Sequence, residues 1–245
     1  MNPPEPSAGG DGRLGMIVAA GGHGVRLGAG GSKQYLPLLG VPMVQRTIGA
    51  LDECSAVDVI VVVVNREDVD YCSSEIVAEL YTKVVAVVGG GSERALSVRN
   101  GLKALSAAGA TEFVGVHDGA RPLITCADVQ RVRDHLDARP DLAGALPALF
   151  SVDTLKRVDE NGRIVETPPR GRFVRAQTPQ VFRWAPFAAA YAQPDSVLVL
   201  STDDSSLVEA AGGRVDVVEG SHENLKVTTV ADVRVAESIL AERHR

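Results

Sequence analysis

The glycine-rich segment from Gly21 to Lys33 carries residue types suited to binding phosphate. It follows five apolar residues, Met16–Ala20, which predict a buried strand. Six glycines and Ala29 leave the backbone amides of this segment open to a ligand. Arg26 and Lys33 add two positive charges to the same loop. Open amides and cations beside a strand end together predict an anion site, most simply for a polyphosphate.

Two common phosphate motifs do not fit this segment. Gly22-His23-Gly24 continues to Leu27, where the dinucleotide fingerprint needs a glycine. The Walker pattern also fails, because no Gly-Lys-Ser/Thr follows at the required spacing. A flexible linker remains the alternative interpretation, although the two cations argue against it.

A second glycine-rich turn, Gly89–Ser97, is expected to follow a strand and open a helix. Ser92 is a suitable N-cap residue, so one interpretation is simply a capped helix. The functional interpretation is that backbone groups, together with Ser97, meet the edge of a nucleotide base.

Asp118 and Arg121 lie in the sequence His117–Pro122, directly after another predicted strand. Mg²⁺ prefers one or two carboxylates plus phosphate oxygens, so Asp118 alone is an adequate protein ligand. Arg121 could then hold a second phosphate. The alternative is a surface ion pair, worth about 0–1 kcal/mol.

Lys226 lies within the apolar stretch Leu225–Val227, which predicts a strand over Lys226–Thr228. A lysine in such a strand is costly unless it faces an anion. The alternative is that its amine reaches solvent along its own aliphatic stem. Asp203 and Asp204 could suggest a metal pair, but a capped helix start is favoured because acids stabilise that end of the helix dipole.

Apolar β-rich runs that alternate with helical patterns must position these loops. A strand–helix alternation of this kind predicts a doubly wound α/β sheet, in which ligands bind beyond the carboxyl ends of the strands. The predicted strands are Leu14–Ala20, Val57–Val64, Lys83–Val88, Phe113–His117 and Leu142–Leu149. The predicted helices are Met43–Glu53, Arg66–Leu80, Glu93–Ala107 and Ala127–Arg139, the last with a capping box of Thr125 and Asp128.

The rhythm changes after Leu149. Val152–Val158 and Arg163–Thr167 flank Asn161-Gly162, a dipeptide typical of tight β-hairpin turns. An isolated hairpin is marginal in water, so a second copy of the chain is expected to cover it. Beyond it, the patterns predict helices Trp184–Ala192, Asp204–Ala211 and Ala231–Arg243, and a strand Arg214–Val218.

Composition limits the class of protein. The chain has 245 residues and a net charge of −6, which argues against a nucleic-acid partner or an anionic membrane surface. The apolar run Val57–Val64 is too short to span a bilayer. Three cysteines without metal spacing and no secretory signal favour reduced thiols and a cytoplasmic location.

We expect a disordered leader over residues 1–13 and one domain over 14–245, with 150–172 as an arm for dimerisation.

In their order along the chain, these loops resemble one family: the cytidylyltransferases that make 4-diphosphocytidyl-2-C-methyl-D-erythritol in the non-mevalonate isoprenoid pathway. The resemblance runs from about Leu14 to the end. It implies a Rossmann-like, mostly parallel nucleotidyltransferase sheet with a protruding β-hairpin arm. The segments that carry it are Ala19–Arg26, Lys33–Tyr35, Gly90–Ser97, His117–Pro122, Asp153-Thr154, Arg170, Gln177–Gln180, Thr202–Asp204 and Asn224–Thr228.

The resemblance implies that a polyol phosphate attacks the α-phosphorus of CTP and that pyrophosphate leaves, with Mg²⁺ or another divalent cation present. It implies that Arg26, Lys33 and Lys226 are catalytic. The nucleotide would be bound by Ala19, Ala20, Gly21, Gly91, Ser92, Arg94, Ser97 and Asp118. The acceptor would be bound by Asp118, Arg121, Thr154, Arg170, Thr178 and Lys226, with Thr154 and Arg170 reaching it across a homodimer. Asp118 would also contact the metal.

Two alternatives stay open at this point. A pentitol-phosphate cytidylyltransferase, for example one acting on ribitol 5-phosphate, shares the CTP loops. A catalytically inactive nucleotide-binding module would have the same fold. The latter predicts loss of Lys33, Lys226 or Asp118, and all three are present.

Overall fold

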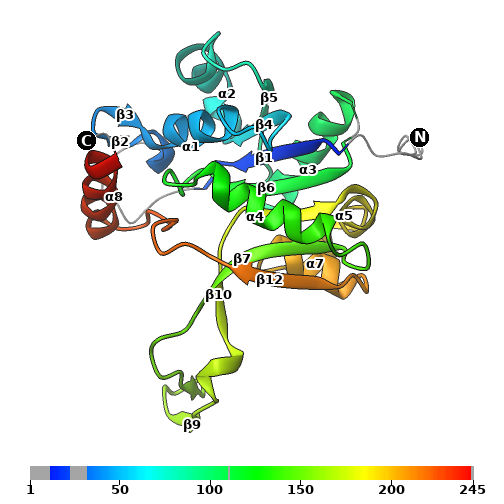
Figure 1. Cartoon of the computed structure of the whole chain (residues 1–245), viewed down its shortest axis with the longest axis vertical. Coiled ribbons are helices and arrows are strands. Elements are labelled where there is room, and N and C mark those ends of the chain that lie inside the picture. Colours follow the sequence, from blue (N-terminus) through cyan, green and yellow to red (C-terminus); the bar gives the residue numbers. More distant parts are fainter. Residues whose placement is uncertain (1–11, 23–31, 110, 244–245) are drawn as a thin grey trace.

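A twisted central sheet organises the chain (Figure 1). The computed structural model describes residues 12–22, 32–109 and 111–243. In that part of the chain the main sheet has the strand order β10-β7-β11-β6-β1-β4-β5, and β12 pairs with β7. The strands are β1 (Leu14–Ala19), β4 (Val59–Val64), β5 (Val84–Gly89), β6 (Phe113–Asp118), β7 (Gly144–Phe150), β10 (Val174–Ala176), β11 (Gln180–Arg183) and β12 (Val215–Glu219).

The sheet has a parallel half and a mixed half. β6, β1, β4 and β5 run parallel, whereas β11 runs antiparallel to both β6 and β7. The mostly parallel α/β sheet predicted from the strand–helix alternation is therefore confirmed. Its helices are α1 (Met43–Asp52), α3 (Arg94–Ala107), α4 (Cys126–Asp137), α5 (Trp184–Tyr191), α6 (Asp195–Leu198), α7 (Asp204–Ala210) and α8 (Val230–Arg243).

Alternation along β1 divides the core into two layers. Met16 and Val18 pack in one cluster with side chains of α1 and α4. Ile17 packs in the other cluster with side chains of α3, α5 and α7. Gly101 lets α3 approach the sheet closely, because a Cβ there would lie 2.6 Å from Ile17 and 2.8 Å from Val63. The parallel strands are thus covered on both faces, as buried parallel sheets require.

Two predicted elements are wrong. The helix expected over Arg66–Leu80 is broken into a 3-10 turn η3 (Arg66–Asp68), a short α2 (Val69–Tyr71) and a π-helical turn η4 (Cys72–Val77). The hydroxyls of Ser73 and Ser74 donate back to the carbonyls of Val69 and Asp70, which is a known competitor of regular helix geometry.

The strand expected over Lys226–Thr228 is also absent. Val227 N–H donates to the carbonyl of Ala120, and Thr228 N–H donates to the carboxylate of Asp232. This segment therefore runs beside the loop after β6 instead of joining the sheet.

The hairpin is shorter than predicted. Only β8 (Arg157–Val158) and β9 (Ile164–Glu166) pair, as a separate two-stranded sheet. The segment between β7 and β10 leaves the body of the protein as an arm (Figure 1). The strands β10 and β11, which the periodicity did not predict, connect the arm back to the sheet.

The prediction that all three cysteines are reduced thiols is wrong for two of them. Cys54, just after α1, and Cys126, at the start of α4, form a disulfide, and Cys72 is a free, buried thiol. The two helices cover the same face of the sheet, which brings the two Cα atoms to 4.9 Å. The sequence separation of 72 residues hides this proximity. In the described residues no helix is long and apolar enough to cross a membrane.

Candidate active site

The carboxyl ends of the central strands meet at one edge of the sheet. Ala19 and Asp118 are register partners on β1 and β6, and Gly89 ends β5 on the far side of β4. The loops after these strands therefore emerge side by side, as the parallel arrangement predicts.

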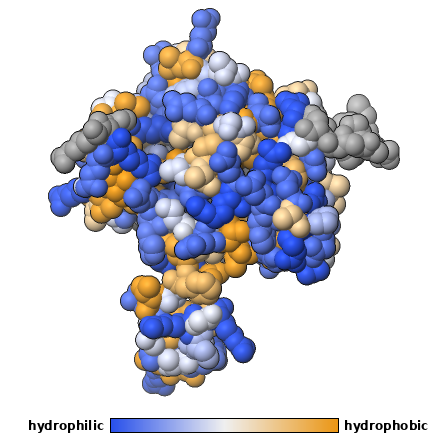
Figure 2. Space-filling view, in the orientation of Figure 1, coloured by the Kyte–Doolittle hydropathy of each residue, from blue (hydrophilic) through white to orange (hydrophobic). Residues whose placement is uncertain are grey.

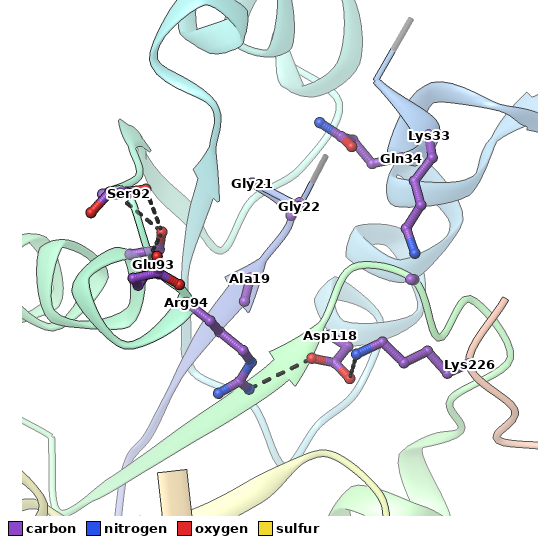
Figure 3. Close-up of a pocket in the computed structure, with 14 residues that line it drawn as sticks. Ala19, Gly21, Gly22, Lys33, Gln34, Ser92, Glu93, Arg94, Asp118 and Lys226 are labelled. Atoms are coloured by element: carbon purple, nitrogen blue, oxygen red, sulfur yellow. Dashed lines mark hydrogen bonds and ion pairs between the residues drawn. The ribbon is translucent and has the colours of Figure 1, made fainter. Parts of the chain in front are cut away.

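A cavity of about 280 Å³ opens at this edge (Figure 3). Every residue predicted to bind the nucleotide lines it, and so do the two predicted catalytic lysines. These residues are Ala19, Ala20, Gly21, Gly91, Ser92, Arg94, Ser97, Asp118, Lys33 and Lys226. Gly22, Gln34, Glu93 and Ala120 also line the cavity and were not predicted. Arg26 lies outside the described residues.

Asp118 gathers three cations at the end of β6. Lys226 Nζ lies 2.9 Å from Asp118 Oδ2, and Arg121 Nε lies 3.4 Å from the same oxygen. Arg94 Nη2 approaches Oδ1 at 3.6 Å. Although burial alone would raise the pKa of Asp118, these three charges hold that pKa well below its ordinary range. Asp118 is therefore a permanently ionised carboxylate in the cavity wall.

A buried hydrogen-bond chain fixes the backbone at Asp118. Asp118 N–H donates to Thr178 Oγ1 at 3.0 Å, and that hydroxyl lies 3.0 Å from His117 Nδ1. His117 Nε2 lies 3.2 Å from the carbonyl of Arg121, which can only accept, so Nε2 carries the proton. Burial lowers the pKa of His117 to about 4. The ring is therefore neutral at pH 7, its Nδ1 accepts, and the Thr178 hydroxyl donates to it.

Lys33 enters the cavity from the 3-10 turn η2 (Lys33–Tyr35), and its Nζ lies 3.4 Å from the carbonyl of Val227. Figure 3 shows its amine on the same side of the cavity as Lys226. The residues around it are tied to η3, because Asp68 Oδ2 accepts from Ser32 Oγ at 2.7 Å and from Gln34 Nε2 at 3.3 Å. These contacts hold the carboxyl end of the glycine-rich segment against the loop after β4.

The turn before α3 is built around Ser97 instead of Ser92. Gly91 N–H donates to Ser97 Oγ at 3.0 Å, and Ser97 Oγ donates to the carbonyl of Glu93 at 3.1 Å. The N-cap of α3 is Glu93, so the prediction of Ser92 as N-cap is wrong. Ser97 closes the loop from inside the helix, and Ser92 lines the cavity.

A second cavity, of about 170 Å³, adjoins the first. Arg94, Asp118 and Lys226 line both cavities and therefore form their shared wall. Arg121 and Thr178, predicted to bind the acceptor, line the second cavity. Arg121 is buried, and its Nη1 donates to the carbonyl of Asn224 at 2.8 Å, so the surface ion pair considered above does not describe it.

Thr154 and Arg170 lie on the arm and line neither cavity. Thr154 and Arg170 are both exposed. Arg170 Nη1 donates to the carbonyl of Val152. Within one chain the structure does not bring them to the site.

The described residues contain no cluster of three or more His, Cys, Asp or Glu that could hold a metal. Asp118 offers one ionised carboxylate in the cavity. That single ligand fits a hard divalent cation only if phosphate oxygens complete the coordination, which is the mode that Mg²⁺ favours.

Comparison with known proteins identifies this arrangement. Residues 14–242 match the family model described as IspD, 2-C-methyl-D-erythritol 4-phosphate cytidylyltransferase. The proteins of that name from Geotalea uraniireducens and Alkaliphilus metalliredigens are 41% and 40% identical over 229 residues, 93% of this chain and 97% and 93% of theirs. The chain belongs to this cytidylyltransferase family.

Solved structures agree with the assignment to the 2-C-methyl-D-erythritol 4-phosphate cytidylyltransferase family. The 4-diphosphocytidyl-2C-methyl-D-erythritol synthase from Anaerococcus prevotii has a TM-score of 0.78 at 28% identity, over 94% of this chain and 97% of that one. The cytidylyltransferase from Francisella tularensis gives 0.78 at 26% identity, over 92% and 99%. The chain is therefore a nucleotidyltransferase enzyme. These matches do not favour the pentitol-phosphate alternative.

Neutral His117 predicts a pH dependence of stability. The pKa of His117 is about 4 in the folded protein and 6.5 ordinarily. Between these pH values, His117 is therefore protonated in the unfolded chain but neutral in the folded protein. The free energy of unfolding should therefore fall as the pH falls from about 6.5 to 4. His117→Asn keeps an acceptor for Thr178 but does not titrate, so we expect a smaller decrease between pH 7 and pH 5 in urea unfolding. The exposed His222→Asn variant should behave as wild type, and equal decreases in wild type and His117→Asn would contradict the assignment.

Proposed function

We propose that this chain transfers a cytidylyl group from CTP to 2-C-methyl-D-erythritol 4-phosphate, giving 4-diphosphocytidyl-2-C-methyl-D-erythritol and pyrophosphate. The observation that carries the proposal is the shared wall of Arg94, Asp118 and Lys226 between two adjoining cavities. A transfer between two substrates requires their reacting groups to meet at one place, and this wall is where the two cavities adjoin.

In this proposal CTP occupies the first cavity, the one lined by Lys33, Ser92 and Lys226. Gly91, Ser92 and Ser97, with the backbone of Ala19 and Ala20, surround the cytosine. The amides from Gly21 onward and the charges of Arg26 and Lys33 hold the triphosphate. The support for this placement is that the described residues proposed to bind CTP all line one cavity. The turn that contains Ser92 and the 3-10 turn that begins with Lys33 form different parts of its wall (Figure 3).

The acceptor phosphate then lies in the second cavity. One of its oxygens attacks the α-phosphorus, a new P–O bond forms, and the bond to the bridging oxygen of pyrophosphate breaks. Lys226 places its amine at this junction, 2.9 Å from Asp118 Oδ2, and its side chain is partly open to solvent, so it is placed to stabilise charge on the α-phosphate. Arg121 and Thr178 contribute to the acceptor side of the wall.

Asp118 would hold a Mg²⁺ ion together with the phosphates. When bound, the ion would neutralise charge on the triphosphate. The residues themselves position the two phosphates and supply positive charge, which is the main task of a protein in phosphoryl transfer.

The arm supports a homodimer. The arm and the adjoining end of β7 expose Phe150, Val152, Val158, Ile164 and Phe173, each more than two-fifths accessible. Figure 2 shows apolar surface on the arm and at its junction with the body. A second copy would cover this surface and bring Thr154 and Arg170 to its partner's acceptor cavity.

We also infer a cytoplasmic location, where CTP is available.

The acceptor is tested by pyrophosphate release. Purified protein with CTP and Mg²⁺ should turn over faster on 2-C-methyl-D-erythritol 4-phosphate than on ribitol 5-phosphate, because the former is the proposed substrate. A preference for ribitol 5-phosphate would favour the pentitol alternative. CTP binding without turnover on any polyol phosphate would indicate an inactive module.

The arm is tested by Arg170→Ala. We expect a higher KM for the acceptor with little change in the KM for CTP, because Arg170 is proposed to reach only the acceptor cavity. Arg172→Ala, in the same 3-10 turn η5 (Arg170–Arg172), is the matched control and should keep the wild-type KM.

A mixed dimer extends this test. An Arg170→Ala chain paired with a Lys33→Ala chain should regain one working site, because each supplies what the other lacks. If mixing restores no activity although mixed dimers form, the site is not shared between subunits.

A further inference from the structure

Asp204 is a buried carboxylate behind the site that lines neither cavity. It is the first residue of α7 and has no solvent-accessible surface. Its Oδ2 lies 2.8 Å from Arg94 Nη2. Its Oδ1 accepts a hydrogen bond of 2.5 Å from the hydroxyl of Tyr191, at the end of α5. One oxygen of this fully buried acid thus accepts a hydrogen bond from Tyr191, and the other forms an ion pair with Arg94.

Helix capping does not explain this carboxylate. The N-cap of α7 is Asp203, whose side chain accepts from Ser206 N–H in a complete capping box. Gln180 ties the same turn to β11, because its Nε2 donates to Asp203 Oδ2 and its Oε1 accepts from Ser205 N–H. The start of α7 is therefore held without Asp204, whose charge is left for Arg94.

Arg94 connects Asp204 to the reacting centre. The same Nη2 that pairs with Asp204 lies 3.6 Å from Asp118 Oδ1. Figure 3 shows the guanidinium directed toward Asp118, on the side opposite Lys226. Burial alone would lower the pKa of Arg94, but its pairing with Asp204 raises that pKa above the ordinary value. Arg94 is therefore a permanent cation at the shared wall.

Asp204 also divides the charges at this wall. A buried carboxylate is costly without its partner, so the pairing restrains the long side chain of Arg94. With Arg94 paired mainly to Asp204, the carboxylate of Asp118 remains available to Lys226 at 2.9 Å. Without Asp204, the anion nearest to Arg94 in these contacts would be Asp118, and Arg94 would compete with Lys226 for it.

We propose that Asp204, held by the hydroxyl of Tyr191, is a positioning residue that fixes Arg94 at the wall between the two cavities and leaves Asp118 to Lys226. The proposal rests on the proposed cytidylyl transfer, for which it adds two residues outside the cavities. Neither residue contacts a substrate in this account.

Asp204→Asn tests the proposal by a double-mutant cycle with Arg94→Gln. We expect Asp204→Asn alone to lower kcat by about tenfold to 10²-fold, as small displacements of positioning groups do. In a protein that already carries Arg94→Gln, Asp204→Asn should lower kcat by less than about a further twofold. The reason is that Asp204 acts on the site through Arg94, which is then absent. If the two effects multiply, Asp204 acts by another route and the proposal is wrong.

Tyr191→Phe provides a second test that keeps both charged partners, Asp204 and Arg94, and removes only the hydroxyl that holds Asp204. We expect kcat to fall about fivefold, because Asp204 loses a hydrogen bond of ordinary strength and holds Arg94 less firmly. The matched control is Tyr81→Phe, which removes a hydroxyl that donates to the carbonyl of Gln45 at 3.1 Å, away from both cavities. Equal kcat values for the two variants would overturn the proposal, even if Asp204→Asn failed to fold. Wild-type protein without cytidylyl transfer would instead overturn the proposed function.

Discussion

The site depends on one carboxylate that holds three cations together. Asp118 lies at the end of β6 with its side chain one-tenth exposed, and Lys226, Arg121 and Arg94 all lie within 3.6 Å of it. These cations come from three separate segments of the chain. Positive groups converging at one place repel one another, and an ionised carboxylate at the centre offsets that repulsion. The segment around Lys226 is not part of the sheet. This ion pair holds it in place together with the bond from Val227 N–H to Ala120 and the bonds that join Asn224 to Arg121 and Thr178.

The mixed half of the sheet supports this carboxylate from behind. Thr178, just before β11, binds the backbone of Asp118 and the neutral ring of His117. Asp204, on α7, binds Arg94. The parallel half thus supplies most of the loops that line the first cavity, and the antiparallel strand with its following helices supplies the groups that fix their charges. In the proposed reaction this division places CTP over the first half and the acceptor against the second.

Local patterns predicted the parts of the structure that depend on local sequence. The apolar runs gave β1, β4, β5, β6 and β7 because buried parallel strands are apolar on both faces. The residues that the family motifs assign to nucleotide binding all line one cavity of the structure. Three failures were set by distant contacts: the disulfide between α1 and α4, the pairing of β10 and β11, and the segment at Lys226. The break in the helix expected over Arg66–Leu80 has a local cause, the hydroxyls of Ser73 and Ser74. The motif Thr202–Asp204 was noticed, but the partner of Asp204 is Arg94, far away in the sequence, so its role could not be predicted.

In the proposed reaction, Asp118 organises the charges for the transfer step more than it binds the nucleotide. The most direct measurement is the single-turnover rate of cytidylyl transfer at saturating CTP in Asp118→Asn, together with the dissociation constant for CTP. Because Lys33 and the glycine-rich loops remain, the account predicts a rate about 10²-fold lower with less than a tenfold change in CTP affinity. A wild-type rate, or a loss confined to CTP affinity, would contradict it.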